Sequence, residues 1–138
     1  IAQLEGGTAA VAVASGMAAI DVALATLARA GDHVIVASTV YGGSHNLVAH
    51  VLQGRGISST RVARGDVRAL AAAITPHTKA VFLESVGNPS GDVADIAAIA
   101  AVAHAQGVAV VSALCAAPDP ESSARLLLAA VNRGASRR

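Results

Sequence analysis

The chain has 138 residues, of which 54% are apolar, and nearly all of this hydrophobic mass is Ala, Val, Leu and Ile because there is one Phe, one Tyr and no Trp. A chain of this length and composition is expected to form one globular domain and to bury about two-thirds of its unfolded surface, which excludes a disordered segment. The formal net charge of +1 and the scattered basic residues argue against a nucleic-acid partner.

Other features of the composition concern compartment and partners. No apolar stretch reaches the roughly 18 residues that cross a bilayer, since Gly, Asp, Arg or His interrupts each one, so we expect a soluble protein without a membrane partner. The single Cys115 rules out an intramolecular disulfide and fits a cytoplasmic location. Because only 14% of the residues are charged, we expect a partner to cover part of the apolar surface. The first residue is Ile1 rather than Met, which suggests a sequence that begins inside a domain.

The first half of the chain alternates strand and helix patterns. Residues 9–14 alternate small and β-branched side chains, which predicts a strand. Residues 17–30 follow as a helix that stops at Gly31. Residues 33–37 are a short β-branched run that predicts a second strand, and residues 44–53 predict the next helix.

The second half continues the alternation. Residues 59–63 predict a strand, and residues 66–74 a short helix whose first residue, an aspartate, is placed to cap it. The strongest strand pattern covers residues 79–84, and a helix is predicted over residues 95–106. Residues 108–111 are a continuous β-branched run, as expected of a parallel strand covered on both faces.

This succession predicts an α/β fold with a mostly parallel sheet flanked by helices. The pattern changes after residue 111, where Pro and acidic residues at 118–121 break the chain and residues 122–132 favour one more helix. We expect residues 1–111 to form the domain and residues 112–138 to be a divergent tail, helical at first and then disordered.

Ligands of such sheets bind beyond the carboxyl ends of the strands, which directs attention to the residues that follow each one. The segment from Ser15 to Met17 opens a helix with little side-chain bulk, which suits an anion or phosphate, although a plain N-cap explains it too. Tyr41 stands before Gly42 and Gly43, which would let a ligand or a backbone come close, and is either a ligand contact or a half-buried anchor. Asn88 precedes Pro89, a common turn pair, whereas Glu84 at the end of an apolar strand is less easily explained by turn chemistry.

Several common sites are absent from the sequence. There is no glycine-rich dinucleotide fingerprint, no phosphate-loop lysine and no Gly-x-Ser-x-Gly elbow, which disfavours a nucleotide-binding domain and a serine hydrolase. The histidines show no metal-binding spacing and are expected to be solvated or capping residues: His33, His45, His50, His77 and His104.

Six segments together resemble the Cys/Met metabolism family of pyridoxal 5′-phosphate (PLP) enzymes, in order and in spacing. They are LEGGTAAV at 4–11, SGMAA at 15–19, AGDH at 30–33, VYGGS at 40–44, TPHTKA at 75–80 and ESVGNP at 84–89. The resemblance is continuous from residue 1 to about residue 111. YGGSHNL at 41–47 and GNP at 87–89 are more similar to O-acetylhomoserine sulfhydrylases (homocysteine synthases) than to the cystathionine lyases and synthases of the family.

The resemblance implies that residues 1–111 are part of the large PLP-binding domain of a fold-type-I, aminotransferase-like enzyme. In that family the segment matching Ser15, Gly16 and Met17 holds the cofactor phosphate, with the amides of Gly16 and Met17 as donors. The resemblance further implies that Tyr41 is catalytic, stacking on the cofactor ring and assisting proton transfer. It assigns Asn88 to the ring hydroxyl and Glu84 to the support of that edge of the site.

The sequence departs from the family at two residues that the chemistry requires. The aspartate that pairs with the cofactor ring nitrogen is replaced by Ser112, which cannot keep that nitrogen protonated as a carboxylate does. The only lysine, Lys79, matches the start of an inner strand and is therefore at the wrong end of the sheet to link the cofactor. The family's Ser-x-x-Lys segment, its substrate-carboxylate arginine and its N-terminal Tyr and Arg have no match.

The resulting prediction is a fragment of a PLP-dependent O-acetylhomoserine sulfhydrylase-like enzyme of transsulfuration and methionine biosynthesis, inactive alone and with weak or no binding of PLP. The family implies a small amino-acid substrate and a homo-oligomer. The alternative is a non-catalytic cofactor-binding or assembly module derived from the family.

Overall fold

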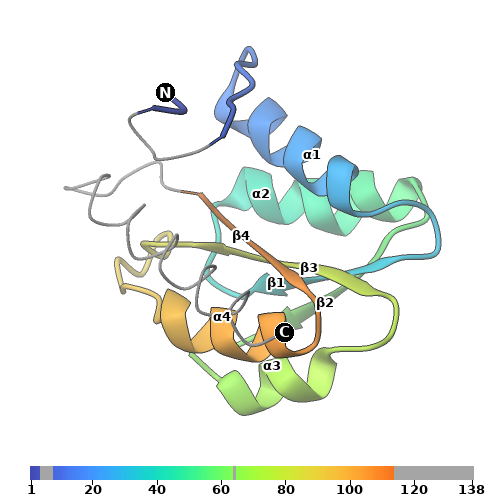
Figure 1. Ribbon diagram of the computed structural model, residues 1–138, viewed down its shortest axis with the longest axis vertical. Helices are drawn as coiled ribbons and strands as arrows, with labels where there is room; N and C mark the ends of the chain where they lie inside the picture. The colour runs from blue at the N-terminus through green and yellow to red at the C-terminus, as the bar shows by residue number, and fades with distance from the viewer. Residues whose placement is uncertain (4–7, 64, 114–138) are drawn as a thin grey trace.

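A four-stranded parallel sheet lies between two layers of helices in the computed structural model, which describes residues 1–3, 8–63 and 65–113, the last five by their backbone only (Figure 1). The strands follow the spatial order β2-β1-β3-β4. Their bounds are His33–Ala37 for β1, Ser58–Val62 for β2, Thr78–Glu84 for β3 and Ala109–Ala113 for β4. The α/β class and the parallel sheet predicted from the sequence are confirmed.

The helices divide between the two faces of the sheet. One face carries α1, Gly16–Leu27, and α2, Gly42–Asn46, which continues into a π-helical stretch, η1, Leu47–Leu52 (Figure 1). The other face carries α3, Val67–Ala73, and α4, Ile96–Ala105. No helix among the described residues is long and apolar enough to span a bilayer.

The two central strands send alternate side chains into two separate cores. Even-numbered Val34, Val36 and Phe82 pack with Leu24 of α1 and with the η1 residues, whereas odd-numbered residues such as Leu83 pack with α3 and α4. Because β1 and β3 are covered on both faces, their sequences read as continuous apolar runs rather than as an alternation. This double burial explains why both strands were predictable within one residue.

Aspartates at two helix starts accept hydrogen bonds from backbone amides. The Asp66 carboxylate accepts from the Ala69 amide at 2.8 Å, and the Asp95 carboxylate accepts from the Ala98 amide at 2.9 Å. Each bond satisfies one of the amide donors that a helix start leaves unpaired. The capping role predicted for Asp66 is confirmed.

Two predicted elements differ from the structure. Residues 9–14 are not a strand: they have no regular structure, and Val11 is 80% exposed. A strand needs a neighbour to pair its backbone groups, and none of the four described strands pairs with this segment. Helix α1 ends at Leu27, earlier than the predicted Ala30, because Ala28 turns to an extended conformation. The predicted tail began at residue 112, but Ser112 and Ala113 belong to β4. Residues 114–138, which include the predicted helix at 122–132, lie outside the described residues.

The prediction that all five histidines are solvated or capping residues is wrong for His33. Its side chain is 7% exposed, and its ring nitrogens contact the hydroxyl oxygens of Thr78 at 2.8 Å and Thr60 at 2.9 Å. These contacts join β1 to both of its neighbouring strands. Burial lowers the pKa of His33 below the ordinary value of 6.5.

A lowered pKa predicts that His33 makes folding stability depend on pH. As the pH falls below about 6.5, the unfolded chain takes up the imidazole proton before the folded chain does, so the free energy of unfolding decreases. Urea unfolding from pH 7.5 downward should show a weaker loss for His33→Gln than for wild type. His50→Gln at an exposed site is the control, and parallel curves for wild type and His33→Gln would contradict the assignment.

Two leucines of α1, one buried and one exposed, allow a test of which face of the helix packs on the sheet. Leu24 is fully buried against the sheet, whereas Leu27, one turn later, is 39% exposed. Leu24→Ala is expected to lower the free energy of unfolding by about 2–5 kcal/mol, and Leu27→Ala by less than about 1 kcal/mol. Equal losses in denaturant titrations of the two variants would show that α1 packs differently.

Candidate functional site

The order of the strands creates a crevice at the carboxyl ends of β1 and β3. The chain leaves β1 toward α2 on one face of the sheet and leaves β3 toward α4 on the opposite face (Figure 1). Two neighbouring parallel strands whose connections diverge in this way form the usual ligand site of an open α/β sheet. The segments that border the crevice are residues 38–44 and residues 85–91.

One open cleft occupies this position, with a volume of about 770 Å³, within the range of small-molecule sites. The start of α1 forms one wall, and the segments after β1 and β3 form the others. All six residues predicted from the sequence as site residues line it: Ser15, Gly16, Met17, Tyr41, Glu84 and Asn88. The structure therefore brings together residues up to 73 positions apart, from Ser15 to Asn88.

The start of α1 borders the cleft and has backbone donors that no described residue is seen to pair. The Ser15 hydroxyl oxygen accepts a hydrogen bond from the Ala18 amide at 3.1 Å, so Ser15 is an N-cap. The first helical bond runs from the Ala19 amide to the Ser15 carbonyl at 3.0 Å, which leaves the amides of Gly16 and Met17 without a partner inside the helix. A Cβ built on Gly16 would meet no described atom within 4 Å, so an anion has room at this positive end.

Glu84 ties the segment after β1 to the end of β3. Its Oε1 atom accepts hydrogen bonds from the Tyr41 amide at 2.9 Å and from the Ser44 hydroxyl at 3.2 Å. Ser44 is only 1% exposed, and its hydroxyl group therefore needs such an acceptor. Through these two bonds the carboxylate fixes the backbone at Tyr41.

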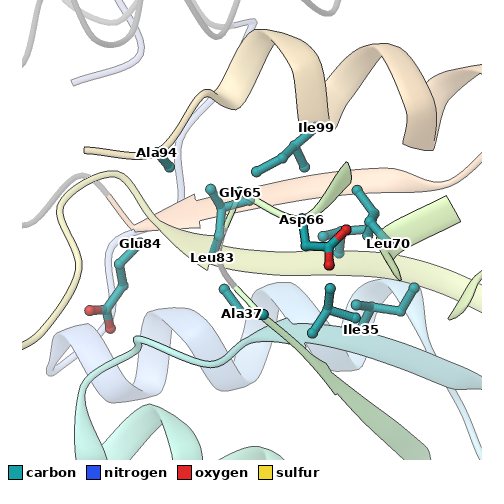
Figure 2. Close-up of a pocket in the computed structure, with 12 residues that line it drawn as sticks. Ile35, Ala37, Gly65, Asp66, Leu70, Leu83, Glu84, Ala94 and Ile99 are labelled. Carbon is teal, nitrogen blue, oxygen red and sulfur yellow. The ribbon is translucent and has the colours of Figure 1, made fainter. Parts of the chain in front are cut away.

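Figure 2 shows that the Glu84 carboxylate points away from the apolar hollow on the other side of the sheet. That hollow is lined mainly by aliphatic side chains, among them Leu70, Leu83 and Ile99. The alternation along β3 accounts for the separation, because Leu83 faces α4 and Glu84 faces the side of α1 and α2. The hollow belongs to the packed core, and the two carboxylates among its described lining residues are engaged elsewhere: Asp66 caps α3 and Glu84 bonds the Tyr41 amide.

The Tyr41 ring lies against Gly43 and close to α1. A Cβ built on Gly43 would be 2.6 Å from Cε1 of Tyr41 and 3.2 Å from the sulfur of Met17. The ring thus occupies the space that a side chain at position 43 would need. Tyr41 is nevertheless 53% exposed, so the ring is open to the cleft.

The segment after β3 folds back on itself and presents Asn88. Val86 and Val93 form an isolated antiparallel bridge, and the Gly87 amide donates to the Asp92 carbonyl at 2.8 Å. The Asn88 amide donates to the Thr39 carbonyl at 3.4 Å, which joins this turn to the segment after β1. The Asn88–Pro89 peptide bond is cis. Asn88 is therefore both a turn residue and a wall of the cleft.

Lys79 lies far from the cleft along β3. It is the second residue of that strand, whereas Glu84 is the last, and its Nζ is 3.9 Å from the carboxylate of Asp32, which precedes β1. Lys79 thus sits at the amino end of the sheet, opposite the site, as predicted. The backbone of Ser112 pairs with Leu83 near the carboxyl end of β4.

Two site features were missed by reasoning from the sequence. Ser44 was assigned to a helix and to the segment at 40–44 without a role in the site, although its burial and its bond to Glu84 make it part of the site. Gly43 was interpreted as room for a ligand or backbone, whereas the Tyr41 ring fills that space. Within the part of the chain that the structure describes, no group of three or more His, Cys, Asp or Glu could hold a metal.

The known proteins that this chain is similar to include enzymes named for homocysteine synthesis and for cystathionine cleavage. The homocysteine synthase of Schizosaccharomyces pombe is 49% identical over 108 residues, 78% of this chain and 25% of that protein. The cystathionine beta-lyase of Bacillus subtilis is 43% identical over 107 residues, 78% of this chain and 27% of that protein. The structure of the O-acetylhomoserine sulfhydrylase of Wolinella succinogenes superposes with a TM-score of 0.83 at 36% identity, over 91% of this chain and 37% of that one.

The chain spans about a quarter of the length of the curated relatives it matches. Its structural neighbours are fold-type-I PLP enzymes, which confirms the fold expected from the resemblance. Residues 1–118 match the family described as Cys/Met metabolism PLP-dependent enzyme. With this match over most of its length, the chain belongs to the PLP-dependent enzymes of Cys/Met metabolism.

Proposed function

We propose that the chain is the cofactor-binding part of an O-acetylhomoserine sulfhydrylase-like enzyme, which replaces the acetoxy group of O-acetylhomoserine by sulfide to form homocysteine. The observation that carries the proposal is the convergence of all six site residues on one cleft at the diverging ends of β1 and β3. A homocysteine synthase that is 49% identical and an O-acetyl-L-homoserine sulfhydrylase that is 44% identical support this reaction.

The residues of the cleft fit PLP. Among the described residues, the amides of Gly16 and Met17 have no partner inside the helix and would hold a phosphate, for which the open space beside Gly16 leaves room. Tyr41 would stack on the pyridine ring and move a proton through its phenol oxygen. Asn88 would bond the ring hydroxyl, and Glu84 supports the same edge. When bound, the cofactor supplies an electron sink for negative charge at the substrate α-carbon.

We further propose that residues 1–138 alone bind the cofactor weakly and reversibly and do not turn over substrate. The reaction needs a lysine that links the cofactor and moves the α-proton, and the only lysine of the sequence is Lys79. Its pairing with Asp32 at the amino end of the strands supports this view. The amino-acid substrate, a homo-oligomeric assembly and a cytoplasmic location are part of the same proposal.

A substitution at Ser15 can separate helix capping from phosphate binding. Ser15→Asp keeps an N-cap but places a negative charge where the phosphate would sit. We expect Ser15→Asp to abolish the binding of pyridoxamine 5′-phosphate in equilibrium dialysis while unfolding remains close to wild type. Ser15→Ala should instead lower the free energy of unfolding by about 1 kcal/mol and weaken binding less.

Unphosphorylated pyridoxamine is the ligand control, because its amine, like that of the phosphorylated form, cannot form an imine with a lysine. Wild-type protein should prefer the phosphorylated ligand, and equal binding of the two would refute the phosphate cradle. Binding that Ser15→Asp leaves unchanged would place the phosphate elsewhere.

The absence of turnover can be tested with Lys79→Gln. Wild type and Lys79→Gln are expected to release no homocysteine from O-acetylhomoserine and sulfide with added PLP, since Lys79 is remote from the cleft. Turnover that Lys79→Gln removes would overturn the assignment. Activity gained only on mixing with a complete homologue would favour the assembly module.

A further inference from the structure

The ring of Tyr41 is held from two directions in the structure. From the backbone side, the Glu84 carboxylate accepts the Tyr41 amide at 2.9 Å. From the ring side, the missing side chain of Gly43 leaves a space that Cε1 and Cδ1 of Tyr41 fill, at 2.6 and 3.1 Å from where a Cβ would stand. Both restraints act on the same residue from different parts of the chain.

The first restraint depends on Ser44. A half-buried carboxylate on a strand end could adopt several rotamers, and one that accepts two donors on the same oxygen is confined to one of them. The Ser44 hydroxyl supplies the second donor at 3.2 Å, and its burial excludes water as a substitute partner. Ser44 therefore orients Glu84, and Glu84 in turn holds the backbone of Tyr41.

The second restraint sets the direction of the ring. The position of a Gly43 Cβ is also 3.2 Å from the Met17 sulfur, so the ring and the sulfur meet over the same glycine. Met17 belongs to the start of α1, where the phosphate is proposed to bind. A ring that leans on Gly43 is thereby kept beside the phosphate end of the cleft.

We propose that Glu84, Ser44 and Gly43 are positioning residues that orient the Tyr41 ring before any ligand binds. The inference rests on the proposed function for the meaning of this orientation, which is to present the ring face to the cofactor. The orientation itself is a property of the unliganded chain. Glu84 acts through Tyr41, because the oxygen with described bonds is already occupied by the Tyr41 amide and the Ser44 hydroxyl.

The fluorescence of Tyr41 can be used to test this arrangement. Tyr41 is the only tyrosine and there is no tryptophan, so the intrinsic fluorescence of the protein reports on this ring alone. Acrylamide quenching measures how exposed the ring is, and fluorescence anisotropy measures how freely it moves on the nanosecond scale. Neither measurement needs the cofactor or any activity.

Gly43→Ala and Glu84→Ala are the test variants. Each is expected to raise the acrylamide quenching constant, up to about twofold as Tyr41 goes from 53% exposed toward full exposure, and to lower the anisotropy. Glu84→Gln should restore wild-type values, because its amide oxygen can still accept from the Tyr41 amide and the Ser44 hydroxyl. A change in quenching or anisotropy that came from general destabilisation would not be reversed by Glu84→Gln.

Matched controls are available in the same chain. Gly54→Ala repeats the glycine change at a position where a Cβ meets nothing within 4 Å, and Asp21→Ala removes a carboxylate that pairs with Arg55 instead. Both should keep wild-type quenching and anisotropy. Circular dichroism selects the variants that are folded, and Ser44→Ala, which removes the second donor to Glu84, tests the carboxylate restraint if Glu84→Ala does not fold.

Wild-type quenching and anisotropy in folded Gly43→Ala or Glu84→Ala would overturn the positioning role of that residue. The outcome is distinguishable from failure of the proposed function. Altered Tyr41 fluorescence in these variants, together with no phosphate-dependent binding by wild type, would uphold the positioning unit and reject the cofactor site. Phosphate-dependent binding by wild type, together with unaltered Tyr41 fluorescence in the variants, would uphold the cofactor site and reject the positioning role.

Discussion

The divergence of the chain after two adjacent parallel strands is the constraint on which the rest of the site depends. Because β1 and β3 run in the same direction, their carboxyl ends meet at one edge, and their connections to opposite faces leave that edge uncovered. The start of α1 closes the third side. A cleft in this place follows from topology, and side chains then decide what it binds.

The carboxylate of Glu84 converts this topological gap into a defined site. Without a bond across the crevice, the segments after β1 and β3 would be independent loops with independent motions. The bonds from Glu84 to the Tyr41 amide and the Ser44 hydroxyl make them one unit. The Asn88 amide, which donates to the Thr39 carbonyl, adds a second link between the same segments.

Local patterns predicted the fold well where burial is two-sided, as for residues 33–37 and 79–84, whose apolar runs have no other reading at that length. They failed for residues 9–14, because alternation marks a segment able to pair but cannot say whether a partner strand exists. They also failed for His33, since its partners Thr60 and Thr78 are brought close only by the sheet register. The contact between Ser44 and Glu84 spans 40 positions and was unpredictable for the same reason.

The parallel sheet places the residues of the cleft and the only lysine of the sequence at opposite edges. The groups suited to hold a phosphate and a flat ring lie together at the carboxyl edge, whereas the only lysine lies at the amino edge and pairs with Asp32. A strand is rigid along its length, so no side-chain rotation at Lys79 can bring its amine to the end of β3 that carries Glu84. Under the proposed function, the residues at the carboxyl edge would hold the cofactor, whereas Lys79 could not provide the covalent link.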